Sequence, residues 1–237
     1  MFKSCQPRPS ASSSAKYTGL SVGETVYIPN ANLETRPEVL RQMMSAHPLA
    51  AVVTLNQDGL IASHIPLVHE EDGTEWGVLK GHVSRANSQW KDLPSNVDAL
   101  AIFAGPQHYI SASWYPGKLD DGKDVPTWNY VVVHAYGPLR TVEDPAWLLK
   151  HLHSLTDTQE AESREPWSVS DAPPDYIAAL MKGIVGFELP VRRLEGKWKV
   201  SQNRNLRDRE GVVSELTKLN TSESLRMKTL VEGALQK

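Results

Sequence analysis

The stretch Leu-Ala-Ala-Val-Val-Thr-Leu-Asn-Gln-Asp-Gly-Leu-Ile-Ala-Ser-His-Ile-Pro-Leu-Val, residues 49–68, decides the fold. A run of β-forming residues at Leu49–Leu55 leads into the turn signal Asp58-Gly59. From there Leu60–Val68 runs back, with Ile61, Ile65 and Leu67 alternating with smaller or polar residues. This pattern predicts an antiparallel hairpin rather than the strand–helix–strand unit of a parallel sheet.

The rest of the chain repeats this kind of signal, with helical segments between the strands. We expect helices at Asn87–Leu93, after Asp144-Pro145, at Asp171–Met181 and from Arg207 onward. The expected strands are Trp76–Val83, Val97–Ala104, Trp128–Tyr136 and a hairpin of Ile184–Leu194 with Lys197–Ser201 around Glu195-Gly196. Short connections between strands favour a mainly β fold with helices (α+β), built as an antiparallel barrel with helical additions. The absence of Gly-x-Gly-x-x-Gly and of a phosphate loop argues against a doubly wound sheet.

Composition divides the chain into three parts. Residues 1–25 are rich in Ser, Pro, Lys and Gly and lack apolar periodicity, which predicts a disordered N-terminal extension. Residues 26–218 carry the strand signals and form the expected barrel domain, and residues 219–237 are expected to form a helical tail.

Charge and cysteine usage exclude several classes of protein. The 237 residues carry a formal net charge of −3, without the basic stripe typical of nucleic-acid-binding proteins. The single cysteine, Cys5, excludes an internal disulfide framework and a thiolate metal cluster. No apolar run approaches the length of a membrane span, and no secretory signal is evident. We therefore expect no metal and no membrane, and a cytoplasmic location, with the nucleus left open.

Polar and aromatic residues gather in four short runs that a plain core would not need. These runs are Gly81–Asn87, Gly105–Ser111, Val125–Tyr130 and Lys197–Arg204. Mixed aromatic and hydrogen-bonding groups suit a flat, polar-edged aromatic ligand with an anionic tail. Flavin mononucleotide (FMN) is the natural candidate. Gly105–Ser111 is the weakest of the four, because packing of an aromatic loop explains much of it.

The first run has the features of a phosphate site. Strand alternation places His82 on the opposite face from Val83, and the chain then turns into the helix expected near Asn87. A helix start favours an anion, Ser84 adds a hydroxyl and Arg85 a guanidinium fork. The alternative is an ordinary strand-to-helix turn with a surface arginine.

The other candidate residues also have two interpretations. His64 would face a ligand ring or be a satisfied structural histidine. Trp128 would either pack at the edge of a small hydrophobic core or contact the ligand ring. Core packing does not readily explain Thr127 and Asn129. Near the end of the last strand, Lys199, Gln202 and Asn203 would donate to a flavin edge or phosphate, or form a solvated loop.

At these runs the sequence resembles the PaiB-type FMN-binding family, known as FMN-binding negative transcriptional regulators. The resemblance covers about Tyr27 to Val213. Its motifs, in order, are Tyr27–Pro29, Asp58–Leu60 with Ser63–Pro66, Gly81–Trp90, Phe103–Pro106 with Tyr109–Tyr115, Val125–Gly137, and Lys197–Arg204 with Asp208–Gly211. The family pattern usually has Ala-Arg-Ala-Asn-Pro and Ser-Pro-x-Trp-Tyr, so Ser84, Ser88 and Ala112 are mild departures.

The resemblance implies a split β-barrel related to pyridoxamine-phosphate-oxidase-like flavoproteins. It further implies a homodimer with FMN at the subunit interface. By the same analogy the phosphate would lie at Ser84, Arg85 and Asn87, and the flavin near Thr127, Trp128, Asn129, Lys199, Gln202 and Asn203.

The function expected from these features is small-molecule redox chemistry or redox sensing by an FMN-binding flavoprotein. No residue stands out as a general acid or base, so we assign no catalytic residue and no particular substrate. One alternative is a PaiB-like negative transcriptional regulator, although the charge argues against nucleic-acid binding. Another is a barrel that binds a different planar ligand such as heme, for which His64, His82, His108 and His134 are available.

Overall fold

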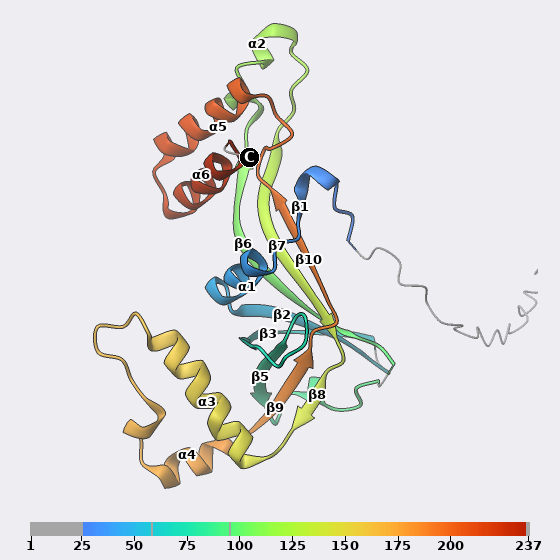
Figure 1. The fold of residues 1–237 in the computed structure, drawn as a ribbon, viewed down its shortest axis with the longest axis vertical. Helices are drawn as coiled ribbons and strands as arrows, with labels where there is room; N and C mark the ends of the chain where they lie inside the picture. The colour runs from blue at the N-terminus through green and yellow to red at the C-terminus, as the bar shows by residue number, and fades with distance from the viewer. Residues whose placement is uncertain (1–25, 58, 95, 236–237) are drawn as a thin grey trace, which may run out of the picture.

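The computed structural model describes residues 26–57, 59–94 and 96–235, so the predicted extension 1–25 lies outside the described residues. Ten strands form two antiparallel sheets (Figure 1). The large sheet has the order β1-β10-β7-β6-β2-β3, formed by Leu33–Glu34, Arg193–Lys199, Thr127–Gly137, Ala99–Ile110, Leu49–Asn56 and Gly59–Pro66. The small sheet has the order β4-β5-β9-β8, formed by Val68–Glu70, Val78–Ser84, Ile184–Pro190 and Arg140–Val142. The expected split barrel with helical additions is confirmed.

Strand alternation gives the large sheet two unlike faces. Its inner face carries fully buried residues such as Val52, Ala101 and Val133, which pack against α1 (Pro37–Ala46), the inner side of the small sheet and α6 (Ser222–Leu235). The other face, which we call the open face, is covered by no helix of the described residues (Figure 1). Along cross-strand neighbours it runs through His64, Ala51, Ile102, His134 and Glu195.

Two helices leave the barrel between β8 and β9. They are α3 (Pro145–Glu160) and α4 (Pro174–Met181), and we call residues 145–181 the arm (Figure 1). Asp144 caps α3 through the N–H of Ala146, as expected for an Asp-Pro helix start. Four large apolar side chains of the arm stay 38–56 % exposed: Leu149, Trp167, Tyr176 and Leu180.

The C-terminal helices form a pair at the far end of the large sheet. They are α5 (Leu206–Leu219) and α6, and they bury Val212, Leu216, Met227 and Val231 between them and the sheet. The remaining elements are single turns: η1 (Asn30–Asn32), η2 (Ser88–Trp90), η3 (Ala112–Trp114), α2 (Lys118–Asp121) and η4 (Val169–Asp171). The predicted domain boundary after residue 218 falls at the end of α5 and stays a prediction.

The hairpin predicted around Glu195-Gly196 is wrong. These two residues lie inside β10, and β9 and β10 belong to different sheets. The chain crosses from the large to the small sheet after Gly137 and crosses back after Pro190, and the N–H of Arg192 donates to the carbonyl of Tyr136 at 2.8 Å. Gly137 is required where these two crossings meet, because a Cβ there would overlap the main-chain oxygen of Pro190.

Two further local predictions are corrected. The helix expected over Asn87–Leu93 is one 3-10 turn, Ser88–Trp90. The run Gly105–Ser111, interpreted as a loop, is mostly strand, because β6 pairs with β7 as far as Ile110. Within the described residues, no helix has both the length and the apolarity to cross a bilayer.

Candidate functional site

The predicted site residues fall into two groups on the large sheet and its small-sheet neighbour. One group lies at the β3 edge, where an open pocket of about 490 Å³ is lined by His64, His82, Ser84 and Asn87 together with Leu180 and Gly183. We call this the edge pocket. Ser84 ends β5, and its hydroxyl accepts from the N–H of Ala86 at 3.2 Å. Four of the residues predicted to bind the cofactor therefore share one pocket.

The turn that follows Ser84 is held by its own hydrogen bonds. The amide of Asn87 donates to the Ser63 hydroxyl at 3.0 Å and accepts from the N–H of Gln89 at 2.8 Å. The Gln89 side chain in turn donates to the carbonyl of Val52 at 2.8 Å. Asn87 therefore caps the 3-10 turn and links it to Ser63 of β3. Because only one 3-10 turn follows Asn87, the helix dipole expected to attract an anion is small.

Arg85 joins the two ends of the arm. Its Nη1 pairs with Glu143 at 2.6 Å, and its Nε and Nη2 donate to the carbonyls of Lys182 and Ile184 at 3.1 and 3.2 Å. Its own N–H donates to the carbonyl of Gly183 at 2.8 Å. A guanidinium has five N–H donors, so two remain for an anion. Glu143 and Gly183 lie on either side of the arm, which makes Arg85 the clasp at its base.

His82 lines the pocket and is paired with a buried histidine of the arm. Its Nδ1 lies 3.1 Å from Nε2 of His151 on α3. His151 is 2 % exposed, and its ring stacks on that of Trp147 with a centroid distance of 5.2 Å. Trp147 is fixed by an N–H bond of 2.8 Å to Glu188, and it lies against Gly186, which has no side chain to displace it.

The contact between the two rings indicates which nitrogen of each histidine carries the proton. Nδ1 of His151 is buried without a hydrogen-bond partner. An orphaned buried N–H is rarer than an orphaned acceptor, so we assign the proton of His151 to Nε2. Nε2 then donates to Nδ1 of His82, and His82 carries its own proton on Nε2. His82 is thereby held as a neutral donor beside the edge pocket.

Burial keeps both rings uncharged. It lowers the pKa of His151 to about 4, with a smaller contribution from His82, and it lowers the pKa of His82 as well. A histidine whose pKa is lower in the folded than in the unfolded protein stabilises the fold fully above the unfolded value. That stability is lost as the pH falls toward the folded value.

Replacing His151 by phenylalanine should flatten this pH dependence. Between about pH 7.5 and pH 5 the shift of His151 lowers the free energy of unfolding of the native protein by about 2 kcal/mol, and His151→Phe should lack that part of the loss. Urea denaturation at the two pH values measures it. His153→Phe on the same helix leaves the pair intact and should keep the full loss. Equal slopes for His151→Phe and the native protein would contradict the assignment.

The second group of predicted residues lies where β7 begins and β10 ends. Lys199 donates to the Thr127 hydroxyl at 2.5 Å. Trp128 is 48 % exposed, donates to Gln107 at 3.1 Å and meets the ring of Tyr109 edge-on. Trp128, Tyr109 and Lys199 form an aromatic and cationic ledge on the open face, which we call the strand-end ledge. Thr127 is in phase with buried Asn129 and reaches Lys199 at the end of the strand.

The other members of this group lie elsewhere. Asn129 is 1 % exposed on the inner face and donates to the Ser201 hydroxyl at 2.8 Å. Gln202 accepts from the N–H of Val200 and donates to the carbonyl of Trp198, in a cleft beside α6. Asn203 is exposed. The structure thus brings Thr127, Trp128 and Lys199 together and separates them from Asn129 and Gln202.

The edge pocket and the strand-end ledge are far apart within one chain. On β6, Ile102 is in register with Ala51 and so with His64, whereas Tyr109 is in register with Trp128. On β7 the same two positions are His134 and Trp128, and six residues of strand at about 3.3 Å each separate them by ~20 Å.

Sequence reasoning missed His151, Glu143 and Leu180. His151 carries no local signal, because it does not share a helix face with His153 and its partner is a strand histidine 69 residues away. Glu143 and Leu180 carry no local signal for a site. Their roles follow only from the return of the arm to β9.

Comparisons with known proteins agree with this architecture. A family model described as a "Putative FMN-binding domain" matches residues 26–193. The Bacillus subtilis protein called protease synthase and sporulation protein PAI 2 is 32 % identical over 212 residues, 90 % of this chain and 99 % of that protein. An uncharacterized Emericella nidulans protein is 33 % identical over 231 residues, 83 % of this chain and 92 % of its own.

A solved structure shares the fold at low identity. It is described as the FAD and heme binding protein from Mycobacterium smegmatis and has a TM-score of 0.50 at 14 % identity, over 71 % of this chain and 73 % of its own. At that identity the likeness concerns the fold alone.

Proposed function

The chain belongs to the PaiB-type family of FMN-binding split-barrel flavoproteins, and from that premise we propose that two copies hold FMN between their open faces. The edge pocket of one copy would take the phosphate, and the strand-end ledge of the other copy would cover the flavin ring. The bound flavin would serve small-molecule redox chemistry or redox sensing. The observation that carries the proposal is the separation of ~20 Å along the strands between the two groups of site residues within one chain.

The edge pocket fits a phosphate. It offers the Nε2 proton of His82 and the Ser84 hydroxyl. Arg85 is not a lining residue, but it donates to the carbonyls of Gly183 and Ile184, which are, and two of its N–H donors are unused. His64 is exposed and lines the same pocket. Neutral donors around one guanidinium suit an anion that must be oriented as well as attracted.

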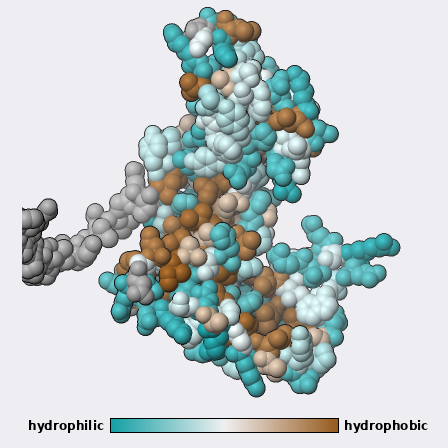
Figure 2. All heavy atoms as spheres, turned by 180° about the vertical axis from the view of Figure 1, so that it is seen from behind, coloured by the Kyte–Doolittle hydropathy of each residue, from teal (hydrophilic) through white to brown (hydrophobic). Residues whose placement is uncertain are grey.

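The open face supports pairing with a second copy. Large apolar side chains stay exposed on and beside it, including Leu49, Leu60, Tyr109 and Trp128. Figure 2 shows apolar surface gathered across the middle of the molecule on this side. An apolar patch of this kind commonly marks an interface. Buried in a dimer, it would exclude water from the flavin.

When bound, FMN supplies hydride or electron transfer, and the protein's part is to orient it. Trp128 and Tyr109 offer aromatic surface to the ring, and Lys199, fixed by Thr127, offers a cation near its polar edge. His134 lies in the middle of the open face, and burial lowers its pKa, so it is a neutral donor or acceptor near neutral pH.

A single charge on the open face tests the proposal. Ala104 is exposed on β6 opposite Val132, so Ala104→Arg should leave the subunit folded but place a cation in the proposed interface. We expect monomers by sedimentation velocity and FMN binding at least tenfold weaker by flavin fluorescence quenching. Ser214→Arg, an exposed position on α5, is the matched control and should stay dimeric and yellow. A monomeric Ala104→Arg protein with unchanged FMN affinity would overturn the shared site.

A further inference from the structure

A cavity beside the C-terminal helix pair has no part in the proposed flavin site. It is a cleft of about 740 Å³, which we call the α6 cleft. Its walls come from η1–β1, the start of α1, the end of β10, and helices α5 and α6, and they include Leu33, Val39, Trp198, Arg209 and Leu230. Clefts of this size with mostly apolar walls and few polar groups are typical of small-molecule sites.

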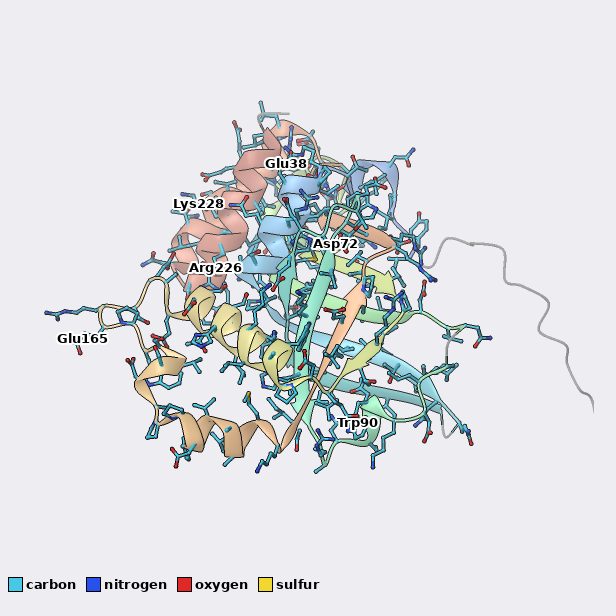
Figure 3. The ribbon with its side chains drawn as sticks, turned by 60° about the horizontal axis from the view of Figure 1, so that its bottom comes forward. Glu38, Asp72, Trp90, Glu165, Arg226 and Lys228 are labelled. Atoms are coloured by element: carbon cyan, nitrogen blue, oxygen red, sulfur yellow. The ribbon has the colours of Figure 1, made fainter. Side chains whose placement is uncertain are left out.

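The α6 cleft is separate from both parts of the flavin site. Trp198 points to the inner side of β10, toward Leu40 of α1, whereas Lys199 and its register neighbour Tyr130 lie on the open face. Figure 3 shows Trp90, the aromatic neighbour of Arg85, at the opposite end of the view from Lys228 of α6. A ligand in the α6 cleft would therefore leave the flavin site free.

Arg209 is the polar group that distinguishes this cleft. Its Nη1 donates to the carbonyl of Ala234 at 2.9 Å, and its Nε is buried without an acceptor. No carboxylate of the described residues forms an ion pair with it. A partly buried guanidinium without a counter-charge is unfavourable, and an anion would relieve that cost. The other cation in the cleft, Arg36, is already neutralised by Glu34 through two hydrogen bonds.

The sequence around Arg209 points the same way. In the motif Asp208-Arg209-Glu210-Gly211, the Asp208 carboxylate accepts from the N–H of Gly117, and the N–H of Asp208 donates to Asn205, the N-cap of α5. Gly211 lets the helix approach the carbonyl of Trp114. Packing and hydrogen bonding within the fold explain Asp208 and Gly211, but the Arg209 guanidinium has no anionic partner among the described residues.

We propose that the α6 cleft binds a small organic carboxylate with an aromatic or otherwise apolar body. The carboxylate would pair with Arg209, while Trp198, Val39 and Leu230 would contact the body. An Arg–carboxylate pair prefers the two-pronged geometry that the free N–H groups of Arg209 permit.

Isothermal titration of the protein saturated with FMN tests this, with 2-naphthoate as the probe and 2-naphthalenemethanol as its uncharged analogue. The naphthoate should bind once per chain, and the alcohol at least tenfold more weakly. Arg209→Gln should weaken naphthoate binding by at least tenfold, and Arg209→Lys by less. The flavin absorbance of each variant should stay that of the native protein.

A second variant blocks the cleft without touching the charge. A Cβ on Gly233 meets no atom within 4 Å, so Gly233→Leu fills open space from the α6 wall. It should abolish naphthoate binding, whereas Gly233→Ala should retain it. No binding to the native protein, equal binding to Arg209→Gln or Gly233→Leu, or displacement of FMN by the probe would each overturn the proposal. Loss of the flavin with naphthoate binding intact would overturn the proposed function alone.

Discussion

Gly137→Ala should destabilise the protein by about 3 kcal/mol, a large share of the stability of a single domain. The added methyl would overlap the carbonyl oxygen of Pro190, which belongs to main chain fixed where the two sheets exchange strands, and it would crowd Cδ2 of the Leu189 side chain. The Leu189 methyl can shift, but the Pro190 oxygen cannot, so relief requires moving β9 or the end of β7. Urea denaturation followed by tryptophan fluorescence measures the loss.

The matched control for Gly137→Ala is the same substitution at Gly233. There the new Cβ meets open space inside α6, and alanine favours a helix by ~1 kcal/mol over glycine. We expect a higher midpoint for Gly233→Ala and a much lower one for Gly137→Ala. Midpoints for Gly137→Ala within error of the native value would show that the crossing is not tightly packed.

Arg85→Ala should weaken FMN binding by about 100-fold, because the phosphate loses a charged fork worth roughly 2–3 kcal/mol. Riboflavin has the same ring without the phosphate, so its affinity should change little. Fluorescence quenching by both ligands at one ionic strength separates the two contributions.

Glu143→Gln tests the same arginine from the other side. The pair between Arg85 and Glu143 is half exposed, so its removal should lower stability by no more than about 1 kcal/mol. With the competing carboxylate gone, FMN should bind as tightly as before or several-fold more tightly. Equal losses of FMN and riboflavin in Arg85→Ala would instead mean that Arg85 acts only by clasping the arm.

Much of the fold could be predicted because its signals are local. The hairpin of β2 and β3 follows from alternation and from the turn at Gly59, whose φ of 118° favours glycine. The hairpin around Glu195-Gly196 failed because nothing local says that β9 and β10 part into different sheets. The strand expected to end at Ala104 continues to Ile110 in β6. Pro106 indicated an earlier end, because proline cannot donate a hydrogen bond to a neighbouring strand, but a register shift between Ala104 and Gln107 accommodates it.

The candidate site was harder to predict for the same reason. Polar residues at strand ends drew attention to Ser84, Trp128 and Lys199. Which of them meet, and on which face, depends on register across six strands. His151 reaches His82 only because α3 folds back over the small sheet. Asn129 alternates onto the inner face, a consequence of strand phase that its neighbours in sequence do not reveal.

The arm has a consequence for how relatives of this protein can diverge. Because Val142 and Gly186 are direct neighbours in the small sheet, residues 143–185 are, in topological terms, the loop of one β-hairpin. Closure entropy rises only slowly with loop length. The arm can therefore be lengthened, trimmed or exchanged over evolutionary time while every strand keeps its partner. Leu180 and Gly183, which belong to this loop, line the edge pocket. Such exchanges would therefore alter which ligands fit the edge pocket, while the strand pairing stays constant.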